Sequence, residues 1–159
     1  MIIKNLVDED FVNYKKPSLF ILFPYCNFKC CKELGNDICQ NSSLVKLSDI
    51  NADANLICER YLNNPITKAI VMGGLEPLDS FKDVLEFVST LRNKYSCDDD
   101  IVIYTGYKEE EVKDKIEELK LYRNIIIKFG RYIPNQKEHF DQVLGVNLAS
   151  NNQYSVKIS

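Results

Sequence analysis

Four short apolar runs, separated by segments with helical periodicity, most constrain how this 159-residue chain can fold. The runs are 18–24 (SLFILFP), 68–72 (KAIVM), 101–105 (IVIYT) and 125–129 (IIIKF). A continuous apolar run of this length predicts a strand that is buried on both faces. Because strand and helix patterns alternate, we expect an α/β domain with a mostly parallel sheet that helices cover or half-cover.

Three amphipathic segments supply the predicted helices. They are 48–63, for which Ser48 is the expected cap, then 81–94, and finally the highly charged 108–121. The alternating tail 154–158 predicts a fifth strand at a sheet edge. Since no repeat, linker or low-complexity stretch interrupts the pattern, we interpret residues 1–159 as a single domain.

Length and charge exclude several classes of protein. A complete eightfold α/β barrel needs about 250 residues, so that fold is excluded unless it is truncated. Twenty basic against 23 acidic residues give a net charge of −3, which argues against a nucleic-acid partner. No apolar run reaches the roughly 18 residues that cross a bilayer, and the first ten residues lack a signal-peptide core. We expect a cytoplasmic protein with no membrane partner.

Cysteines are the strongest chemical signal. Cys26, Cys30, Cys31 and Cys39 lie close together, whereas Cys58 and Cys97 are isolated. In a reducing compartment such clustering indicates a metal site more than a disulfide framework. An iron–sulfur cluster, a zinc ion bound by all four clustered cysteines, and unliganded thiols all remain open at this point.

Two glycine segments follow predicted strands in the same way as the cysteines do. Gly73-Gly74 comes after the second apolar run and Gly106 after the third. Ligands of parallel sheets bind at the carboxyl ends of the strands, and paired glycines let a ligand approach the backbone closely. We therefore expect the cysteines and both glycine segments to converge on one site.

These segments together carry a family resemblance. Cys26-x3-Cys30, Gly73-Gly74-Leu75-Glu76-Pro77 and Tyr104-Thr105-Gly106-Tyr107 resemble radical S-adenosylmethionine enzymes, which are partial β/α barrels. The short chain, residues 125–132 (IIIKFGRY) and Ser150-Asn151-Asn152-Gln153 resemble the activating proteins of anaerobic (class III) ribonucleotide reductases. The resemblance extends from about residue 18 to the end of the chain.

The resemblance implies a [4Fe-4S] cluster and S-adenosylmethionine as cofactors. In that family three cysteines hold three irons, and the fourth iron binds S-adenosylmethionine, which is cleaved reductively to methionine and a 5′-deoxyadenosyl radical. The radical takes a hydrogen from a glycine of the partner, the anaerobic ribonucleotide reductase, and flavodoxin or ferredoxin donates the electron. Carried onto this chain, the cofactor-binding residues are Gly73, Gly74, Glu76, Thr105, Phe28 and Asn152.

The cysteine spacing departs from the family pattern Cys-x3-Cys-x2-Cys, because Glu33 stands where the third cysteine is expected. We favour Cys26, Cys30 and Cys39 as the ligands, with six extra residues before Cys39; the alternative replaces Cys30 by Cys31. Gln40 stands in place of an aromatic residue that follows the last cysteine. The adenine contact is therefore expected from Phe28 or Tyr25.

Two other functions stay open on the sequence alone. The chain could be a small iron–sulfur or zinc module that keeps the fold without cleaving S-adenosylmethionine. It could also be a radical enzyme that acts on another substrate, although so short a chain leaves few residues for a substrate chamber. These length and motif considerations favour a protein partner.

Overall fold

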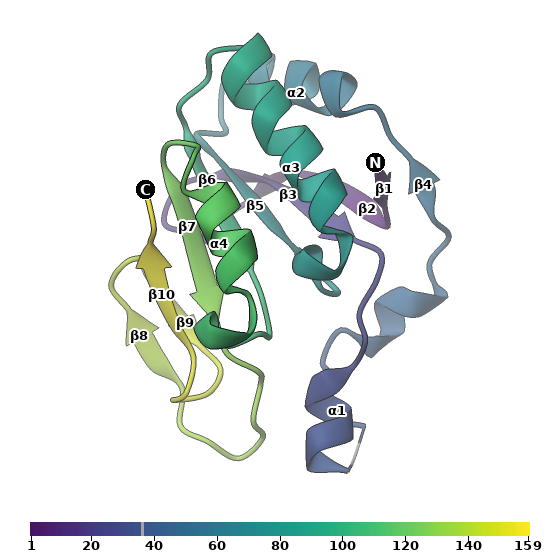
Figure 1. The fold of residues 1–159 in the computed structure, drawn as a ribbon, viewed down its shortest axis with the longest axis vertical. Helices are drawn as coiled ribbons and strands as arrows, with labels where there is room; N and C mark the ends of the chain where they lie inside the picture. Colours follow the sequence, from purple (N-terminus) through teal and green to yellow (C-terminus); the bar gives the residue numbers. More distant parts are fainter. Residues whose placement is uncertain (36) are drawn as a thin grey trace.

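A six-stranded sheet organises the computed structural model, which describes residues 1–35 and 37–159 (Figure 1). Its spatial order is β10-β7-β6-β5-β3-β2. The strands are β2 (Asn5–Asp10), β3 (Ser18–Phe23), β5 (Ala69–Gly74), β6 (Asp100–Tyr104), β7 (Ile125–Phe129) and β10 (Tyr154–Lys157). The four central strands run parallel, whereas β2 and β10 pair antiparallel at the two edges.

The four apolar runs form the four parallel strands, as their composition predicts. Every residue of β5 and β7 is buried, and β6 is buried over its three central residues. The predicted edge strand is also confirmed, because β10 pairs with β7 through Val156 and Ile127. Between β2 and β10 the sheet stays open in the described part of the chain. The partial β/α barrel stays a prediction.

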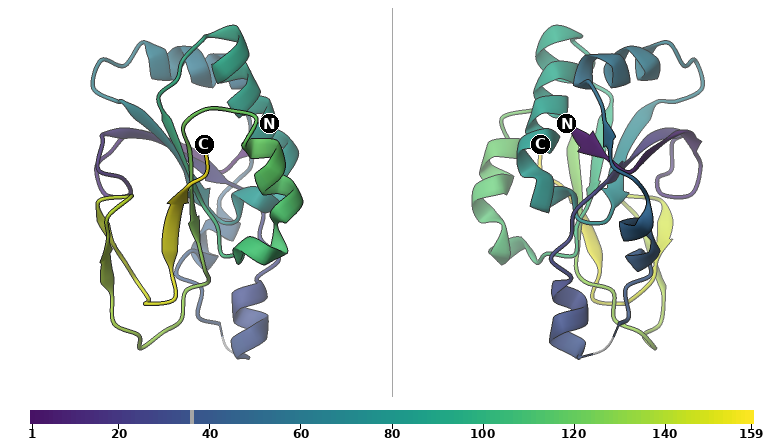
Figure 2. Two further views of the ribbon diagram at one scale, coloured as in Figure 1. Left: turned by 60° about the vertical axis from the view of Figure 1, so that its left-hand side comes forward. Right: turned by 90° about the vertical axis from the view of Figure 1, so that its right-hand side faces the viewer.

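Helices α2 (Ala54–Leu62), α3 (Phe81–Ser89) and α4 (Lys113–Leu119) cover one face of the sheet (Figure 2). They bury the larger apolar cluster, whose largest members include Phe23, Phe87, Phe129, Met72 and Leu91. The predicted 81–94 helix is found as α3 and a π-helical turn, Thr90–Lys94, that continues it. The predicted 108–121 helix is shorter than expected, because a 3-10 turn, Glu109–Glu111, precedes α4.

The predicted start of the first helix at Ser48 is wrong. Strand β4 (Ile50–Asn51) occupies that position and pairs with β1 (Ile2–Ile3). The cap of α2 is instead Asp53, whose carboxylate accepts a hydrogen bond from the Asn55 amide at 2.7 Å. The hydrophobic periodicity did not reveal this boundary because β4 is formed by pairing with β1, which lies far away in the sequence.

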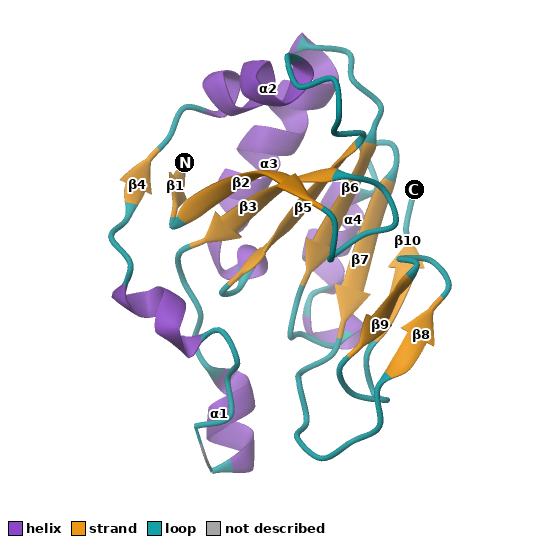
Figure 3. Ribbon diagram, turned by 180° about the vertical axis from the view of Figure 1, so that it is seen from behind, coloured by secondary structure: helices purple, strands orange, loops and turns teal. Residues whose placement is uncertain are grey.

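The opposite face of the sheet carries a hairpin that the sequence did not indicate (Figure 3). It consists of β8 (His139–Asp141) and β9 (Val146–Leu148). The hairpin and Tyr14, from the segment between β2 and β3, pack on this face and form part of a second apolar cluster. This cluster consists of Tyr14, Ala69, Val71, Val102, Ile126, Leu144 and Leu148.

The segment that carries Cys30 and Cys31 is helical. Residues Lys29–Leu34 form a short helix, α1, which extends beyond the carboxyl edge of the sheet (Figure 1). Gly35 follows it with φ +69°, a left-handed conformation that suits glycine. Asn36, within the predicted insertion, lies outside the described residues.

The described residues contain no candidate membrane-spanning helix. Across residues 1–35 and 37–159, each helix is too short or too polar to cross a bilayer.

Asp141 fastens the hairpin to the sheet, which generates a prediction about stability. Its buried carboxylate accepts hydrogen bonds from the amides of Val143, Leu144 and Ser155 at 2.9–3.0 Å. We expect Asp141→Ala to lower the free energy of unfolding by about 2–4 kcal/mol, because buried amides lose a charged acceptor. Urea denaturation measures this change. Asp98→Ala is the control, since its half-exposed ion pair contributes at most about 1 kcal/mol; equal losses in both variants would contradict the assignment.

Candidate functional site

A cavity of about 500 Å³ lies at the carboxyl edge of the parallel strands. Residues that follow each of the four strands line it, namely Cys26 and Cys30 after β3, Glu76 after β5, Thr105 and Gly106 after β6, and Gly130, Arg131 and Tyr132 after β7. The residues of β9 and the following Ala149 close another side. The convergence predicted from the three separate segments is therefore confirmed, and the segment after β7 joins them.

Three of the clustered cysteines line this cavity together: Cys26, Cys30 and Cys39. Cys31 instead lines a separate cavity with Phe28, although its Sγ lies only 4.0 Å from that of Cys30. Cys58 is fully buried in α2, and Cys97 packs at the edge of the larger core. The geometry thus groups the three cysteines that the sequence favoured, and their role as ligands stays a prediction.

The three cysteines that line the cavity are the thiolate donors that an iron–sulfur cluster needs. Throughout the described ranges, no three His, Cys, Asp or Glu side chains are grouped closely enough to hold one metal ion. In an iron–sulfur cluster each cysteine binds a different iron, so the sulfurs surround a larger group and need not meet at one point. Burial raises the pKa of Cys26 to about 12 and that of Cys30 to about 11. Binding must therefore release thiol protons.

Gly73 and Gly74 are required by packing as well as available to a ligand. A Cβ on Gly73 would lie 2.7 Å from the Phe20 ring, and one on Gly74 would lie 3.0 Å from the Leu22 backbone. Gly74 also has φ +85°, which other residues rarely adopt. Its carbonyl accepts a hydrogen bond from Asn41 Nδ2 at 2.8 Å, which ties the end of the cysteine segment to β5.

Glu76 and Thr105 connect the loops that follow β5 and β6. The Glu76 carboxylate is buried and accepts hydrogen bonds from the amides of Leu78 at 3.1 Å and Gly106 at 2.8 Å. Burial raises its pKa to about 7, and the hydrogen bonds from Gly106, Thr105 and Leu78 offset part of that shift. Both residues line the cavity. The hydrogen bonds of Glu76 connect the loop after β5 to the loop after β6.

Phe28 and Asn152 lie outside the cavity that holds the glycines. Phe28 lines the cavity on the Cys31 side of α1. Asn152 is exposed and donates from Nδ2 to the Arg131 carbonyl at 2.8 Å, while its neighbour Gln153 is the residue that lines the main cavity. The structure therefore does not bring these two predicted residues together with Gly73 and Thr105.

Lys128 is a charged residue of the cavity that sequence reasoning did not select. It lies on β7, is 7% exposed, and donates from Nζ to the Gly130 carbonyl at 2.9 Å. Its ammonium group lies 5.9 Å from the centre of the Tyr104 ring. Burial lowers its pKa to about 8. A lysine inside an otherwise apolar strand was the signal that could have identified it.

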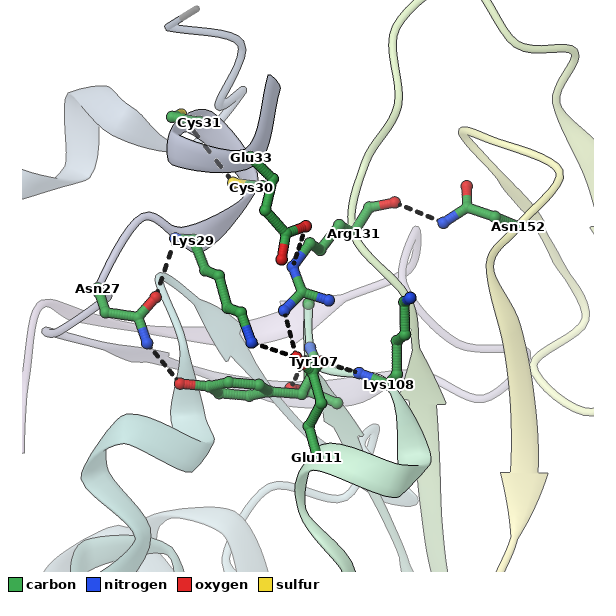
Figure 4. Close-up of polar contacts among 12 residues, drawn as sticks. Asn27, Lys29, Cys30, Cys31, Glu33, Tyr107, Lys108, Glu111, Arg131 and Asn152 are labelled. Atoms are coloured by element: carbon green, nitrogen blue, oxygen red, sulfur yellow. Dashed lines mark hydrogen bonds and ion pairs between the residues drawn. The ribbon is translucent and has the colours of Figure 1, made fainter. Parts of the chain in front are cut away.

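Arg131 is the second charged residue that was missed. Its guanidinium pairs with Glu33 of α1 through Nε at 3.2 Å and with Glu111 through Nη2 at 2.8 Å (Figure 4). Glu111 also pairs with Lys29 of α1. These contacts attach the cysteine-bearing helix to the segments that follow β6 and β7.

Comparison with known proteins gives one match. Residues 17–154, which include every parallel strand, match the family model of the 4Fe-4S single cluster domain. No curated protein and no solved structure matches the chain.

The cavity groups the three cysteines that are predicted to be the cluster ligands, and substitutions test that prediction. We expect Cys26→Ala, Cys30→Ala and Cys39→Ala each to abolish the brown visible absorbance of anaerobically reconstituted protein, because each removes one thiolate that attaches the cluster. Iron and sulfide content measured per chain checks the result. Cys31→Ala and Cys97→Ala are matched controls that should keep both; bleaching by Cys31→Ala with retention in Cys30→Ala would reverse the assignment.

Proposed function

This chain belongs to the 4Fe-4S single cluster domain family, and on that premise we propose that it is a radical S-adenosylmethionine activase. The observation that carries the proposal is one cavity that combines three cysteines, two backbone glycines and a buried lysine. A simple electron-transfer module needs the cysteines alone. Here Gly73, Gly74 and the buried Lys128 line the same cavity as the cysteines, which supports the binding of a second, charged ligand.

When bound, the cluster would supply the electron that cleaves S-adenosylmethionine to methionine and a 5′-deoxyadenosyl radical. Cys26, Cys30 and Cys39 would hold three of its irons and leave the fourth for the amino and carboxylate groups of S-adenosylmethionine. The chain's own contribution is to position these groups and to exclude water from them.

The residues around the cysteines suit the methionyl and adenine ends of that ligand. Gly73 presents only backbone at the cavity floor, between Phe20 and Tyr104. The Lys128 ammonium is buried and donates to the Gly130 carbonyl. Such an ammonium group can also pair with a carboxylate. Phe20, Tyr104 and Tyr132 offer aromatic surface to adenine where Gln40 replaces the aromatic residue of the family pattern. Phe28 and Asn152 would reach this ligand only after a movement of their segments.

The proposed partner is a glycyl-radical enzyme of the anaerobic ribonucleotide reductase type. An open sheet of the kind found in a partial β/α barrel, the fold that we predict, would admit a protein loop at its carboxyl edge. A reduced flavodoxin or ferredoxin would supply the electron. The small iron–sulfur module and the radical enzyme with another substrate are the alternatives.

Reductive cleavage is the direct test of the proposed function. Anaerobically reconstituted protein, reduced with dithionite in the presence of S-adenosylmethionine, should form 5′-deoxyadenosine and methionine in equal amounts, as chromatography measures. Cys97→Ala should retain this activity and Cys26→Ala should lose it. A cluster-loaded protein that forms neither product would support the small iron–sulfur module.

Lys128 tests where the carboxylate binds. Lys128→Met keeps the apolar length of the side chain but removes its charge, so we expect affinity for S-adenosylmethionine to fall about tenfold or more, as for loss of a charge-assisted hydrogen bond. Equilibrium binding to the reconstituted variant measures it, and cluster content should stay unchanged. The control is Lys120→Met, whose half-exposed ammonium pairs with Glu117. Equal affinities in both variants would remove Lys128 from the site.

A further inference from the structure

The side chain of Arg131 lies beside the cysteines without being a ligand. Three cavities at the carboxyl edge are lined by both Arg131 and Cys30, and two of these are also lined by Cys26. The Arg131 side chain is only 8% exposed. A permanently charged group is therefore held, largely out of water, in the walls that surround the cluster cysteines.

The hydrogen bonds of this guanidinium are incomplete. Nε pairs with Glu33 and Nη2 with Glu111, whereas Nη1 is buried and has no partner in the part of the chain that the structure describes (Figure 4). A buried N–H group without an acceptor is destabilising, so native proteins rarely leave one unpaired without a reason. An anionic group bound in the adjoining cavities would offer Nη1 the acceptor that it lacks.

The charges that face Arg131 come from several elements and nearly balance. Glu33 lies on α1 and Glu111 on the segment after β6, and Lys29 of α1 offsets part of their charge. Lys108 and Glu110 line one of the same cavities, and Glu76 lines two others. Neutralising Arg131 removes one positive charge from this set, whereas neutralising Glu33 or Glu111 removes one negative charge, so the sign of each effect on the local electrostatic potential is known beforehand.

We propose that Arg131 sets the reduction potential of the iron–sulfur cluster by placing a buried positive charge beside Cys30. One electron, from a reductant such as dithionite or a reduced ferredoxin, adds one negative charge to the cluster. A nearby cation stabilises that reduced form more than the oxidised form and so raises the potential. Arg131 lines the cavities that Cys26 and Cys30 also line and is not itself a cluster ligand, so it is a tuning and positioning residue.

A purely mechanical role makes a different prediction. The Arg131–Glu33 ion pair also braces α1, so loss of either residue would loosen Cys30 in the same way. Loosening lowers the fraction of protein that holds a cluster, and it acts alike in both variants. An electrostatic role instead gives Arg131→Gln and Glu33→Gln opposite effects on the potential, since one removes a positive charge and the other a negative charge.

The experiment is a redox titration of the reconstituted full chain, followed by the paramagnetic resonance of the reduced cluster without S-adenosylmethionine. We expect Arg131→Gln to shift the potential to more negative values, Glu33→Gln to more positive values, and Arg131→Lys to lie between wild type and Arg131→Gln. Arg123→Gln, which removes an exposed arginine paired with Asp98, should leave the potential unchanged.

Shifts of the same sign in Arg131→Gln and Glu33→Gln, or no shift in either, would overturn the proposal. If Arg131→Gln fails to hold a cluster, Glu33→Gln and Glu111→Gln decide the question, because both must then raise the potential. The inference depends only on the cluster, because the redox titration contains no S-adenosylmethionine. Its failure is therefore separate from failure of the activase proposal, which the formation of 5′-deoxyadenosine tests.

Discussion

Burial of the central strands on both faces is the constraint on which the rest of the structure depends. Strands β3, β5, β6 and β7 are so apolar that helices must cover one face, while the β8–β9 hairpin covers much of the other. Parallel pairing follows from the helical crossovers between successive strands. It also brings the carboxyl ends of the four strands to one edge, where the polar loops that follow the strands lie together. The cavity is therefore a consequence of how the core is built.

That edge concentrates charge that the core would otherwise exclude. Glu76, Lys128 and Arg131 are all at least nine-tenths buried, and each is anchored by backbone groups or by an ion pair. Such groups are costly to bury unless they are paired, so their gathering at one cavity indicates a function for it. The family match places an iron–sulfur cluster in this chain, and a buried cation beside an anionic cluster is electrostatically favourable.

Two proposals use different members of this set. Lys128 and Arg131 both line the cavity that holds the glycines. We assign Lys128 to the second ligand, and we assign Arg131, which also lines two further cavities with Cys30, to the cluster. The contacts of α1 connect the two, because Glu33 and Lys29 attach this helix to the segments after β7 and β6. The cysteines are thus partly positioned by the chain's own ion pairs.

The sequence by itself determined the parallel strands, the edge strand β10, and the convergence of the cysteine and glycine segments, because apolar runs and strand ends are local features. Only the tertiary structure decided the start of α2, where β4 pairs with distant β1, and the packing need for Gly74 against Leu22. It also placed Phe28 and Asn152 outside the main cavity and selected Lys128 and Arg131. The ion pairs of Arg131 with Glu33 and Glu111 join residues far apart in the chain, and no local pattern in the sequence reveals them.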